Sequence, residues 1–447
     1  AAMGSQIVIL PTGAGKSLCF QLPAMLLSGP TLVLYPILSL MADQERRLRE
    51  RGFEPVLLRG GQSEEERREI WEKLKSGKSR FIIANPEVLL VPRVMDQLGA
   101  LGIAHVVIDE AHCVSEWGES FRPSYLRIGE IIEAAGTPLV TAFTATASAP
   151  VLAKIQSYIF ANRGAHQISG NPDRSNIRYG AQGCVIRDLA VRDLIARNEL
   201  PAIVFCSSRG GTEKLARYLT HAFAGEALAP EIRFYHAGLS REEKTSVETW
   251  FFTRERAVLV ATCAYGMGVD KADIRTVIHR DCPPSVEAYL QESGRAGRDG
   301  KASRAFLLWG PGDEGQLRRA KGEREARRIQ DLLDYARNTK TCRREALLAL
   351  LDYQGSGDKP PDSCCDICEG RALGELREEG TLLHFFRRNP RSYTLGEAAE
   401  ILGELEQIGW SAGEAKTALE ELIRAGKLRI LKAFPWKKRM SLRPGRC

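Results

Sequence analysis

The sequence predicts an α/β fold: two tandem lobes with doubly wound parallel sheets, then a helical metal-binding segment and a winged-helix domain. Three observations predict it. Short apolar runs alternate with helical stretches over most of the chain, a cysteine cluster follows, and the last part combines three helical stretches with a hairpin. Buried strands that alternate with helices are typical of parallel sheets covered on both faces.

The first lobe is expected to contain five buried strands separated by helices. The apolar runs that predict these strands are 7–10, 31–34, 81–84, 106–108 and 139–141. Helical stretches are expected at residues 40–51 and 64–75. Gly170, Asn171 and Pro172 interrupt the alternation, so we place the first lobe at residues 1–170.

The second lobe repeats the pattern without repeating the sequence. Its expected strands are 202–205, 232–235, 258–261, 276–278 and 305–308. The alternation ends near Gly312, which places this lobe at residues 171–311. Two α/β lobes of similar size are therefore expected in series.

The remainder divides into a helical cysteine-containing segment at residues 312–370 and a small domain at 371–447. The first begins with a long charged helix expected at Gln316–Asn338. In the second we expect helices at 373–388, 395–402 and 413–425, then a hairpin of 427–431 with 438–442. That order is typical of a winged helix-turn-helix.

Composition narrows the class of protein. The 447 residues are 44% apolar and 27% charged, and no run of 18 apolar residues suggests a membrane span. We see no secretory signal, and cysteines scattered singly indicate a reducing, cytoplasmic compartment. The net charge is +7, and no acidic residue follows Arg424, so the C-terminal end favours polyanions unless it is only a solvated tail.

A phosphate-binding loop is predicted between the first strand and the first helix. Gly13 and Gly15 allow a tight turn whose amides face phosphate oxygens, and the following helix adds the positive end of its dipole. Lys16 is placed to reach the β and γ phosphates of ATP, and Ser17 to ligate Mg²⁺. The nucleotide-binding stretch is Thr12, Gly13, Ala14, Gly15, Lys16 and Ser17, although Leu10 stands where the strict motif has its first glycine.

An acidic pair, Asp109 and Glu110, ends the strand at residues 106–108. Asp109 is expected to hold Mg²⁺ and Glu110 to orient and deprotonate the attacking water. A solvated turn is the alternative. His112 either links this site to the second lobe or is a hydrogen-bonded structural histidine.

Two arginines in the second lobe are candidates for charge stabilisation. Arg295 and Arg298 lie on a helix and its end, and a spacing of three predicts a shared helical face. Arginines aimed at a γ phosphate stabilise transition-state charge. A surface salt-bridge face is the alternative, but the flanking glycines favour close approach to a ligand.

Eight stretches in fixed order resemble the RecQ family of DNA helicases, in the second helicase superfamily. They are 11–17, 35–44, 109–121, 144–146, 204–209, 235–239, 261–271 and 291–300. The resemblance covers nearly the whole chain. It implies two RecA-like lobes that open and close with ATP hydrolysis, 3′-to-5′ movement on single-stranded DNA, and duplex unwinding in repair or recombination.

The stretch from Asp109 to Tyr125 resembles the family's aromatic-rich loop, which couples DNA contact to hydrolysis. Trp117, Phe121 and Arg122 offer stacking surfaces and a cation to a single strand, unless the two aromatics are core residues. The resemblance also implies roles for further residues in transmitting the nucleotide state or lining the cleft or DNA path. They are Thr144, Thr146, Arg209, Gly268, Asp270 and Gln291.

A structural zinc site is expected from Cys342, Cys365 and Cys368, because such sites use four Cys or His ligands. The segment resembles the family's zinc module, but Asp362 stands where the family has a further cysteine. The fourth ligand is therefore either Cys364, which offers the softer thiolate, or Asp362. A disulfide and a metal-free cluster are the competing interpretations.

The C-terminal domain is expected to bind duplex phosphates through basic residues, among them Lys427, Lys437 and Lys438. Trp436 would lie near the wing tip, where it either stacks on the terminal base pair or packs under the wing. Forked and overhang DNA are the expected substrates. The location that fits is the cytoplasm, at the nucleoid if the host is bacterial.

Two other functions stay open. One is an RNA helicase or remodelling ATPase with the same motor, and the other is a non-enzymatic zinc and winged-helix scaffold. The family's adenine-reading motif would precede the phosphate loop by about 25 residues, and only ten residues precede Pro11 here. Either the chain is cropped before this motif or the motif is absent, so adenine selectivity is not supported by this sequence.

Overall fold

The structure is a computed structural model that describes residues 4–443, except 12–14, 117–121, 137–138, 146, 162, 267–270, 321, 352, 354–363, 373, 375, 377 and 406–409. It divides into two compact units. The first unit comprises residues 1–173, 266–270 and 348–355, and the second comprises 174–265, 271–347 and 356–447. Each unit is described by itself.

The first unit contains a seven-stranded sheet whose paired strands are all parallel, in the order β3-β4-β2-β5-β6-β1-β7. The strands are β1 (Gln6–Ile9), β2 (Thr31–Leu34), β3 (Val56–Leu58), β4 (Phe81–Ala84), β5 (His105–Ile108), β6 (Leu139–Thr144) and β7 (His166–Ser169). The five strands expected from apolar runs are confirmed. β3 and β7 were not predicted, because β3 has only three residues and β7 is exposed throughout.

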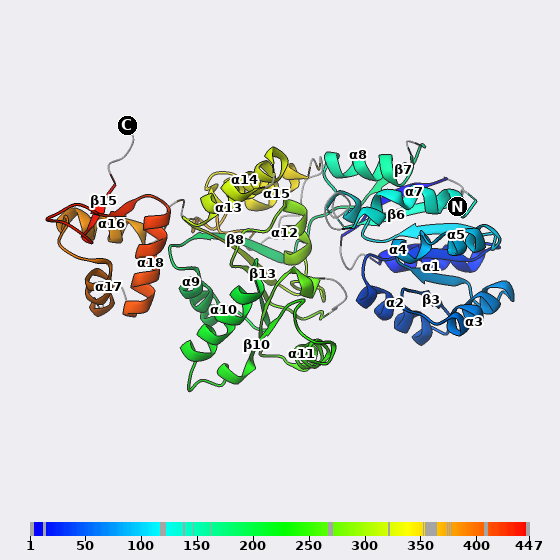
Figure 1. Cartoon of the computed structure of the whole chain (residues 1–447), viewed down its shortest axis with the longest axis horizontal. Helices are drawn as coiled ribbons and strands as arrows, with labels where there is room; N and C mark the ends of the chain where they lie inside the picture. Colours follow the sequence, from blue (N-terminus) through cyan, green and yellow to red (C-terminus); the bar gives the residue numbers. More distant parts are fainter. Residues whose placement is uncertain are drawn as a thin grey trace. The chain divides into compact units, whose positions relative to one another are not determined.

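Helices cover both faces of this sheet (Figure 1). They are α1 (Lys16–Leu26), α2 (Leu38–Glu50), α3 (Glu64–Lys75), α4 (Pro86–Leu89), α5 (Pro92–Gly99), α6 (Cys113–Glu116), η1 (Pro123–Arg127), α7 (Ile128–Ala134) and α8 (Ala149–Tyr158). Adjacent strand residues enter different cores: Leu32 and Leu34 belong to one apolar cluster and Val33 to the other. This double burial explains why the strands are uninterrupted apolar runs.

The second unit contains a six-stranded parallel sheet in the order β10-β11-β9-β12-β13-β8. The strands are β8 (Ile177–Gly183), β9 (Ala202–Phe205), β10 (Ile232–Tyr235), β11 (Val258–Ala261), β12 (Thr276–His279) and β13 (Ser303–Trp309). Five of them confirm the expected strands. The edge strand β8 was not predicted, because Gly180, Gly183 and polar residues lower its β propensity.

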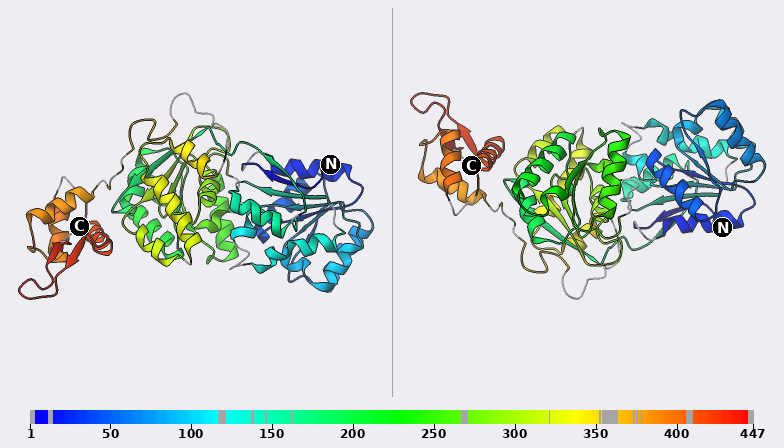
Figure 2. Two further views of the ribbon diagram at one scale, coloured as in Figure 1. Left: turned by 90° about the horizontal axis from the view of Figure 1, so that it is seen from above. Right: turned by 90° about the horizontal axis from the view of Figure 1, so that it is seen from below.

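Helices also enclose the strands of the second sheet, as the green-to-yellow ribbon in Figure 2 shows. They are α9 (Arg187–Arg197), α10 (Arg209–Ala222), η2 (Ala229–Glu231), α11 (Arg241–Thr253), η3 (Cys263–Gly266), α12 (Val286–Ser293), α13 (Asp313–Arg319), α14 (Glu323–Arg337) and α15 (Arg343–Leu350). The single helix expected at 316–338 is wrong, since it is broken into α13 and α14. Gly322, with a φ of +114°, lies at the break.

The C-terminal part consists of α16 (Glu379–Arg388), α17 (Leu395–Glu404), α18 (Ala412–Arg424) and the antiparallel pair β14 (Leu428–Ile430) and β15 (Met440–Leu442). Capping boxes begin α17 at Thr394 and α18 at Ser411. The hairpin gains a bridge between Thr394 and Arg439. Three helices followed by a hairpin match the expected order of a winged helix. Among the described helices, none is both long and apolar enough to cross a bilayer.

Candidate nucleotide and metal sites

The predicted phosphate loop joins β1 to α1 in the first unit. Gly15 is the N-cap of α1, with a φ of +80°, and nothing lies within 4 Å of where its Cβ would be. Only glycine adopts this conformation readily, and the open space leaves room for a phosphate. Ser17 lies in the first turn of α1, while Thr12, Gly13 and Ala14 lie outside the described residues.

Lys16 begins α1 and its side chain is only 14% exposed. Its Nζ is buried and has no hydrogen-bond partner among the described residues. The nearest carboxylate oxygen is Oε1 of Glu110, 3.9 Å away. A buried ammonium without hydrogen bonds is costly, so this geometry fits a site that receives phosphate oxygens.

Asp109 and Glu110 follow β5, as predicted. Burial raises the pKa of Asp109, and the neighbouring Glu110 adds to this, while Lys16 opposes it. Glu110 has a φ of +50°, a strained conformation for a residue other than glycine. Two carboxylates beside a lysine form a donor set suited to Mg²⁺ and the phosphates of ATP.

His112 is buried next to this pair. Its Nδ1 lies 3.2 Å from Oγ1 of Thr144 and 3.4 Å from Oε2 of Glu110. These contacts favour the interpretation of His112 as a hydrogen-bonded structural histidine that connects the ends of β5 and β6. Thr146 lies outside the described residues.

Of the predicted aromatic loop, Trp117 and Phe121 lie outside the described residues. Arg122 is described, and its guanidinium donates to the carbonyl of Pro36 and lies 3.8 Å from Glu87. These contacts could not be predicted from the sequence, because they join positions far apart in the chain. They fix the start of η1 against the segment after β2.

The predicted arginines of the second unit lie in the turn after α12. Arg295 is 3% exposed and Arg298 is half-buried. The shared helical face is wrong, because α12 ends at Ser293 and Gly294 caps it. Gly297 has a φ of +55°, and a Cβ there would lie 2.5 Å from the Lys301 carbonyl oxygen, so glycine is required.

Arg174, which was not predicted as a site residue, stabilises the turn at residues 294–298 that carries Arg295 and Arg298. The guanidinium of Arg174 donates to the carbonyls of Gly294 (3.1 Å) and Gly297 (2.8 Å). Asn176 donates to the same Gly297 carbonyl at 2.8 Å. The turn is therefore braced in a defined conformation.

The other residues that the resemblance implied are distributed over the second unit. Gln291 lies on α12 and is half-buried, whereas Arg209 begins α10 and is exposed. A Cβ on Gly238 would lie 3.3 Å from Nη1 of Arg209, so this guanidinium lies beside the turn that follows β10. Gly268 and Asp270 lie outside the described residues.

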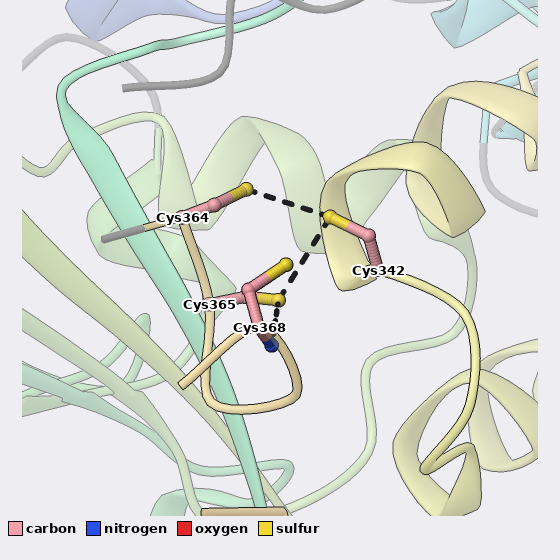
Figure 3. A group of neighbouring side chains, drawn as sticks. All are labelled: Cys342, Cys364, Cys365 and Cys368. Carbon is pink, nitrogen blue, oxygen red and sulfur yellow. Dashed lines mark hydrogen bonds between the residues drawn. The ribbon is translucent and has the colours of Figure 1, made fainter. Parts of the chain in front are cut away.

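The four cysteines of the predicted metal site converge, as Figure 3 shows. The Sγ atoms of Cys342, Cys364, Cys365 and Cys368 all lie within 4.8 Å of one another. Cys342 Sγ is 3.4 Å from Cys364 Sγ and 3.9 Å from Cys365 Sγ. A tetrahedral zinc with Zn–S bonds of about 2.3 Å separates its sulfurs by about 3.8 Å, so the set fits zinc.

Cys364 therefore completes a set of four thiols. Asp362 lies outside the described residues. The disulfide interpretation is wrong for this structure, because all four are free thiols. Burial disfavours ionisation of Cys342, but hydrogen bonds with the Glu345 amide, the Cys364 and Cys368 thiols and the Arg344 amide together lower its pKa. Burial raises the pKa of Cys364 to about 11.

Two arginines next to Cys342 are almost completely buried, at 0% and 1% exposure. Arg343 donates to the Asp366 carboxylate (2.5 Å) and the Tyr335 carbonyl (2.8 Å). Arg344 donates to Cys364 Sγ (3.3 Å) and to the Ile177 carbonyl (2.7 Å). Sequence reasoning missed both, although two basic residues in the first turn of a helix, against its dipole, indicate that acceptors lie nearby.

The C-terminal hairpin presents its aromatic and basic residues outward. Phe434 is 92% exposed and Trp436 is 43% exposed, so neither packs under the wing. Lys437 and Lys438 are exposed, and Arg391 lies over the Trp436 ring at 5.8 Å from its centroid. Lys427 is paired with Glu379, which reduces its availability for phosphates.

Three sequence families match successive parts of the chain. Residues 2–155 match the DEAD/DEAH box helicase family, residues 187–300 match the helicase conserved C-terminal domain, and residues 307–369 match the RecQ zinc-binding family. The matches include all four cysteines of the cluster and most strands of both sheets, whereas β7 and β8 lie outside the matched ranges.

Several curated proteins are similar over most of the chain. The ATP-dependent DNA helicase RecQ of Pasteurella multocida is 34% identical over 371 residues, which cover 81% of this chain and 57% of that protein. The probable ATP-dependent DNA helicase RecS of Bacillus subtilis is 38% identical over 313 residues, 69% of this chain and 61% of that protein. The chain thus spans under two-thirds of the length of these relatives.

Solved structures support the fold. The DUF1998 helicase MrfA bound to DNA aligns with a TM-score of 0.58 at 18% identity, covering 99% of this chain and 55% of that one. The helicase Lhr of Mycobacterium smegmatis, bound to single-stranded DNA and AMP-PNP, aligns with a TM-score of 0.53 at 23% identity, covering 68% of this chain and 44% of that one. With two parallel-sheet lobes, a four-cysteine centre and relatives at 33–38% identity, the chain belongs to the RecQ family of helicases.

Proposed function

We propose that this chain is the motor part of an ATP-dependent DNA helicase, which uses ATP and Mg²⁺ to move 3′ to 5′ on single-stranded DNA and unwind duplexes. The observation that carries the proposal is the buried Nζ of Lys16, which has no hydrogen-bond partner among the described residues and lies 3.9 Å from Glu110. Phosphate oxygens would supply the missing acceptors.

Each residue around Lys16 has its own proposed role in ATP hydrolysis. Ser17 and Asp109 would hold Mg²⁺, which neutralises phosphate charge when bound. Glu110 lies within reach of Lys16 and would position the attacking water and accept its proton. Arg295 and Arg298 would stabilise the charge that develops on the γ phosphate.

DNA would be held by residues outside the nucleotide site. Arg122, Arg209 and the aromatic residues Trp117 and Phe121 are the proposed contacts for the single strand. The exposed Trp436, Lys437 and Lys438 would meet the duplex at the wing, where Trp436 could stack on the last base pair. We assign this activity to DNA repair and recombination in the cytoplasm, at the nucleoid in a bacterial host.

The test compares nucleic acids and substrate ends. ATPase rates are measured with single-stranded DNA, single-stranded RNA and no nucleic acid, and unwinding is measured on forks, 3′ overhangs, 5′ overhangs and blunt duplexes. We expect stimulation by DNA and unwinding of forks and 3′ overhangs. Glu110→Gln should abolish hydrolysis while ATP still binds, and Trp436→Ala should slow unwinding without slowing the DNA-stimulated ATPase.

Other results would contradict the proposal in different ways. Equal stimulation by RNA would favour the remodelling ATPase, and a complete lack of ATPase would favour the DNA-binding scaffold. Unwinding of 5′ overhangs alone would reverse the direction of movement. Unchanged unwinding by Trp436→Ala would remove the stacking role only.

A further inference from the structure

A cavity of about 400 Å³ lies beside the zinc centre and shares no residue with the phosphate loop. It is lined by β8, β13, the end of α9 and the turn at residues 365–371. The turn is attached to the edge of β8: the Asp366 amide donates to the Tyr179 carbonyl (3.1 Å), and the Asp366 carboxylate accepts from the Ala181 amide (2.9 Å). The walls are therefore held together by hydrogen bonds between the turn and the backbone of β8.

Positive charge dominates the lining of this cavity. Its charged residues are Arg178, Arg197, Arg304, Arg371, Asp366 and Glu369. Four arginines against two carboxylates give a net charge of +2. Both carboxylates are already engaged, Asp366 by Arg343 and Glu369 by Arg371.

Three of these arginines, on β8, on β13 and at the end of α9, are incompletely neutralised. Within the described part of the chain, Arg178 and Arg197 have no hydrogen-bonded or ion-paired partner. Burial lowers the pKa of the Arg304 guanidinium, and the nearby charges of Arg178 and Arg371 lower it further. Guanidinium groups that repel one another around a cavity are typical of a site for an anion.

An apolar surface completes the cavity. Phe306 on β13 is half-buried and lines the cavity. A Cβ at Gly180 would lie 3.0 Å from this ring, so the glycine lets the ring lie directly on β8. The ring offers a flat surface to a sugar or a base attached to the anion.

We propose that this cavity binds a phosphomonoester that carries a sugar-sized group. A phosphomonoester has a charge of about −1.5 to −2 near pH 7, which matches the lining, whereas each diester of a DNA backbone carries only about −1. Guanidinium groups bind phosphate oxygens in bidentate fashion. The volume lies within the range of about 300–1,000 Å³ found for small-ligand sites. The ligand is either a free sugar phosphate or the 5′-phosphate end of a DNA strand.

Calorimetric titration of the zinc-loaded full chain tests the proposal, with the ATP site saturated by a non-hydrolysable analogue and Mg²⁺. The probes are ribose 5-phosphate, ribose, and a thymidine dinucleotide with and without a 5′ phosphate. We expect one binding event that requires the phosphate. Arg178→Gln and Arg371→Gln should each weaken it by about tenfold or more, as expected for a lost charge-assisted hydrogen bond.

The control is Arg217→Gln, because Arg217 is 76% exposed on α10 and pairs with Glu213 outside this cavity. Zinc content and melting temperature are measured for each variant, and Arg371 is exposed, so its variant should fold normally. Tighter binding of the phosphorylated dinucleotide than of ribose 5-phosphate would identify a DNA end. Similar affinities would identify a small phosphate, and either result supports the site.

Three results would overturn the proposal: no phosphate-dependent binding, binding unchanged by both cavity variants, or tighter binding of a glutamate-rich peptide than of either phosphomonoester. The titration measures binding of the phosphomonoester while the ATP analogue already occupies the nucleotide site. A failure here would therefore leave the proposed helicase activity untouched, and a lack of ATPase would leave this site untouched.

Discussion

Lys16 and Arg343 are both buried cations, but their surroundings differ completely. The Nζ of Lys16 has no hydrogen-bond partner among the described residues, and its nearest carboxylate oxygen is 3.9 Å away. Arg343, which is 0% exposed, donates to the Asp366 carboxylate and to the carbonyl of Tyr335. One charge is left for a ligand, and the other is satisfied by the protein itself.

The difference separates a binding site from a structural centre. Leaving a buried charge without hydrogen bonds costs folding free energy, so it persists where a ligand later supplies the partner. The backbone beside Lys16 agrees, because Glu110 is held at a φ of +50°. Around Arg343, in contrast, the described contacts join the start of α15 to α14 and to the turn that carries Cys365 and Cys368.

The largest effect is expected from Arg343→Ala. It leaves the half-buried Asp366 carboxylate without its cation, and breaking a buried ion pair costs up to about 3–5 kcal/mol. Denaturant unfolding of the zinc-loaded protein measures the loss. The exposed Arg93→Ala, 3.7 Å from Glu64, is the control and should change stability by less than about 0.5 kcal/mol. A loss below about 1 kcal/mol for Arg343→Ala would contradict the structural role.

Lys16→Ala should have the opposite effects: it should lower the ATPase activity but not the stability of the protein. We expect the ATPase kcat to fall by about 10²–10³, the usual cost of removing one charge-stabilising donor. Stability without nucleotide should stay the same or increase, because an unsatisfied buried ammonium is removed. Steady-state kinetics and thermal unfolding give both values. A destabilised protein with normal kcat would reverse the comparison between the two cations.

The same comparison explains what could be predicted from the sequence. Asp109 and Glu110 directly follow β5, and Lys16 begins the helix that follows β1, so local sequence patterns were enough to place all three. The partners of Arg343 and Arg344 come from Tyr335, Asp366 and Ile177, which no local pattern connects. Buried arginines satisfied by distant carbonyls are invisible until the fold is known.

Predicting the strands from the sequence met the same limit, because local patterns do not show contacts between distant positions. Apolar runs identified ten strands, most of which are buried on both faces, but β3, β7 and the edge strand β8 were missed. Its place at the sheet edge depends on pairing with β13 and on the bridge from Tyr179 to Cys365. The helical face assigned to Arg295 and Arg298 was wrong because the glycines that end α12 also make the tight turn.

A smaller effect is expected at the fourth zinc ligand. Cys364→Ser should lower zinc affinity by about 100-fold. Substituting a residue that only hydrogen-bonds to a zinc ligand already lowers the affinity by about 10- to 100-fold, so losing a ligand should cost at least the upper value. Asp362→Asn should leave the affinity unchanged, since the four thiols already form a complete set. Competition with a chromogenic chelator measures both. Loss of zinc from Asp362→Asn alone would reassign the ligand to the aspartate.

The smallest effect concerns Asp109, whose pKa is raised by burial and by Glu110. A raised pKa in the folded state means that folded Asp109 holds its proton more tightly than unfolded Asp109. The stability that this proton contributes is fully present below the unfolded pKa and is lost as the pH rises through the folded pKa. Asp109→Asn should therefore unfold at the same temperature as the wild type near pH 3 and become more stable by about 1–3 kcal/mol near pH 8 without nucleotide. Thermal unfolding against pH measures this difference. Saturating Mg²⁺ and a non-hydrolysable ATP analogue should reverse it, because a cation held by Asp109 favours the carboxylate. If the two proteins unfolded with the same pH dependence, Asp109 would belong with the satisfied charges around Arg343 rather than with Lys16.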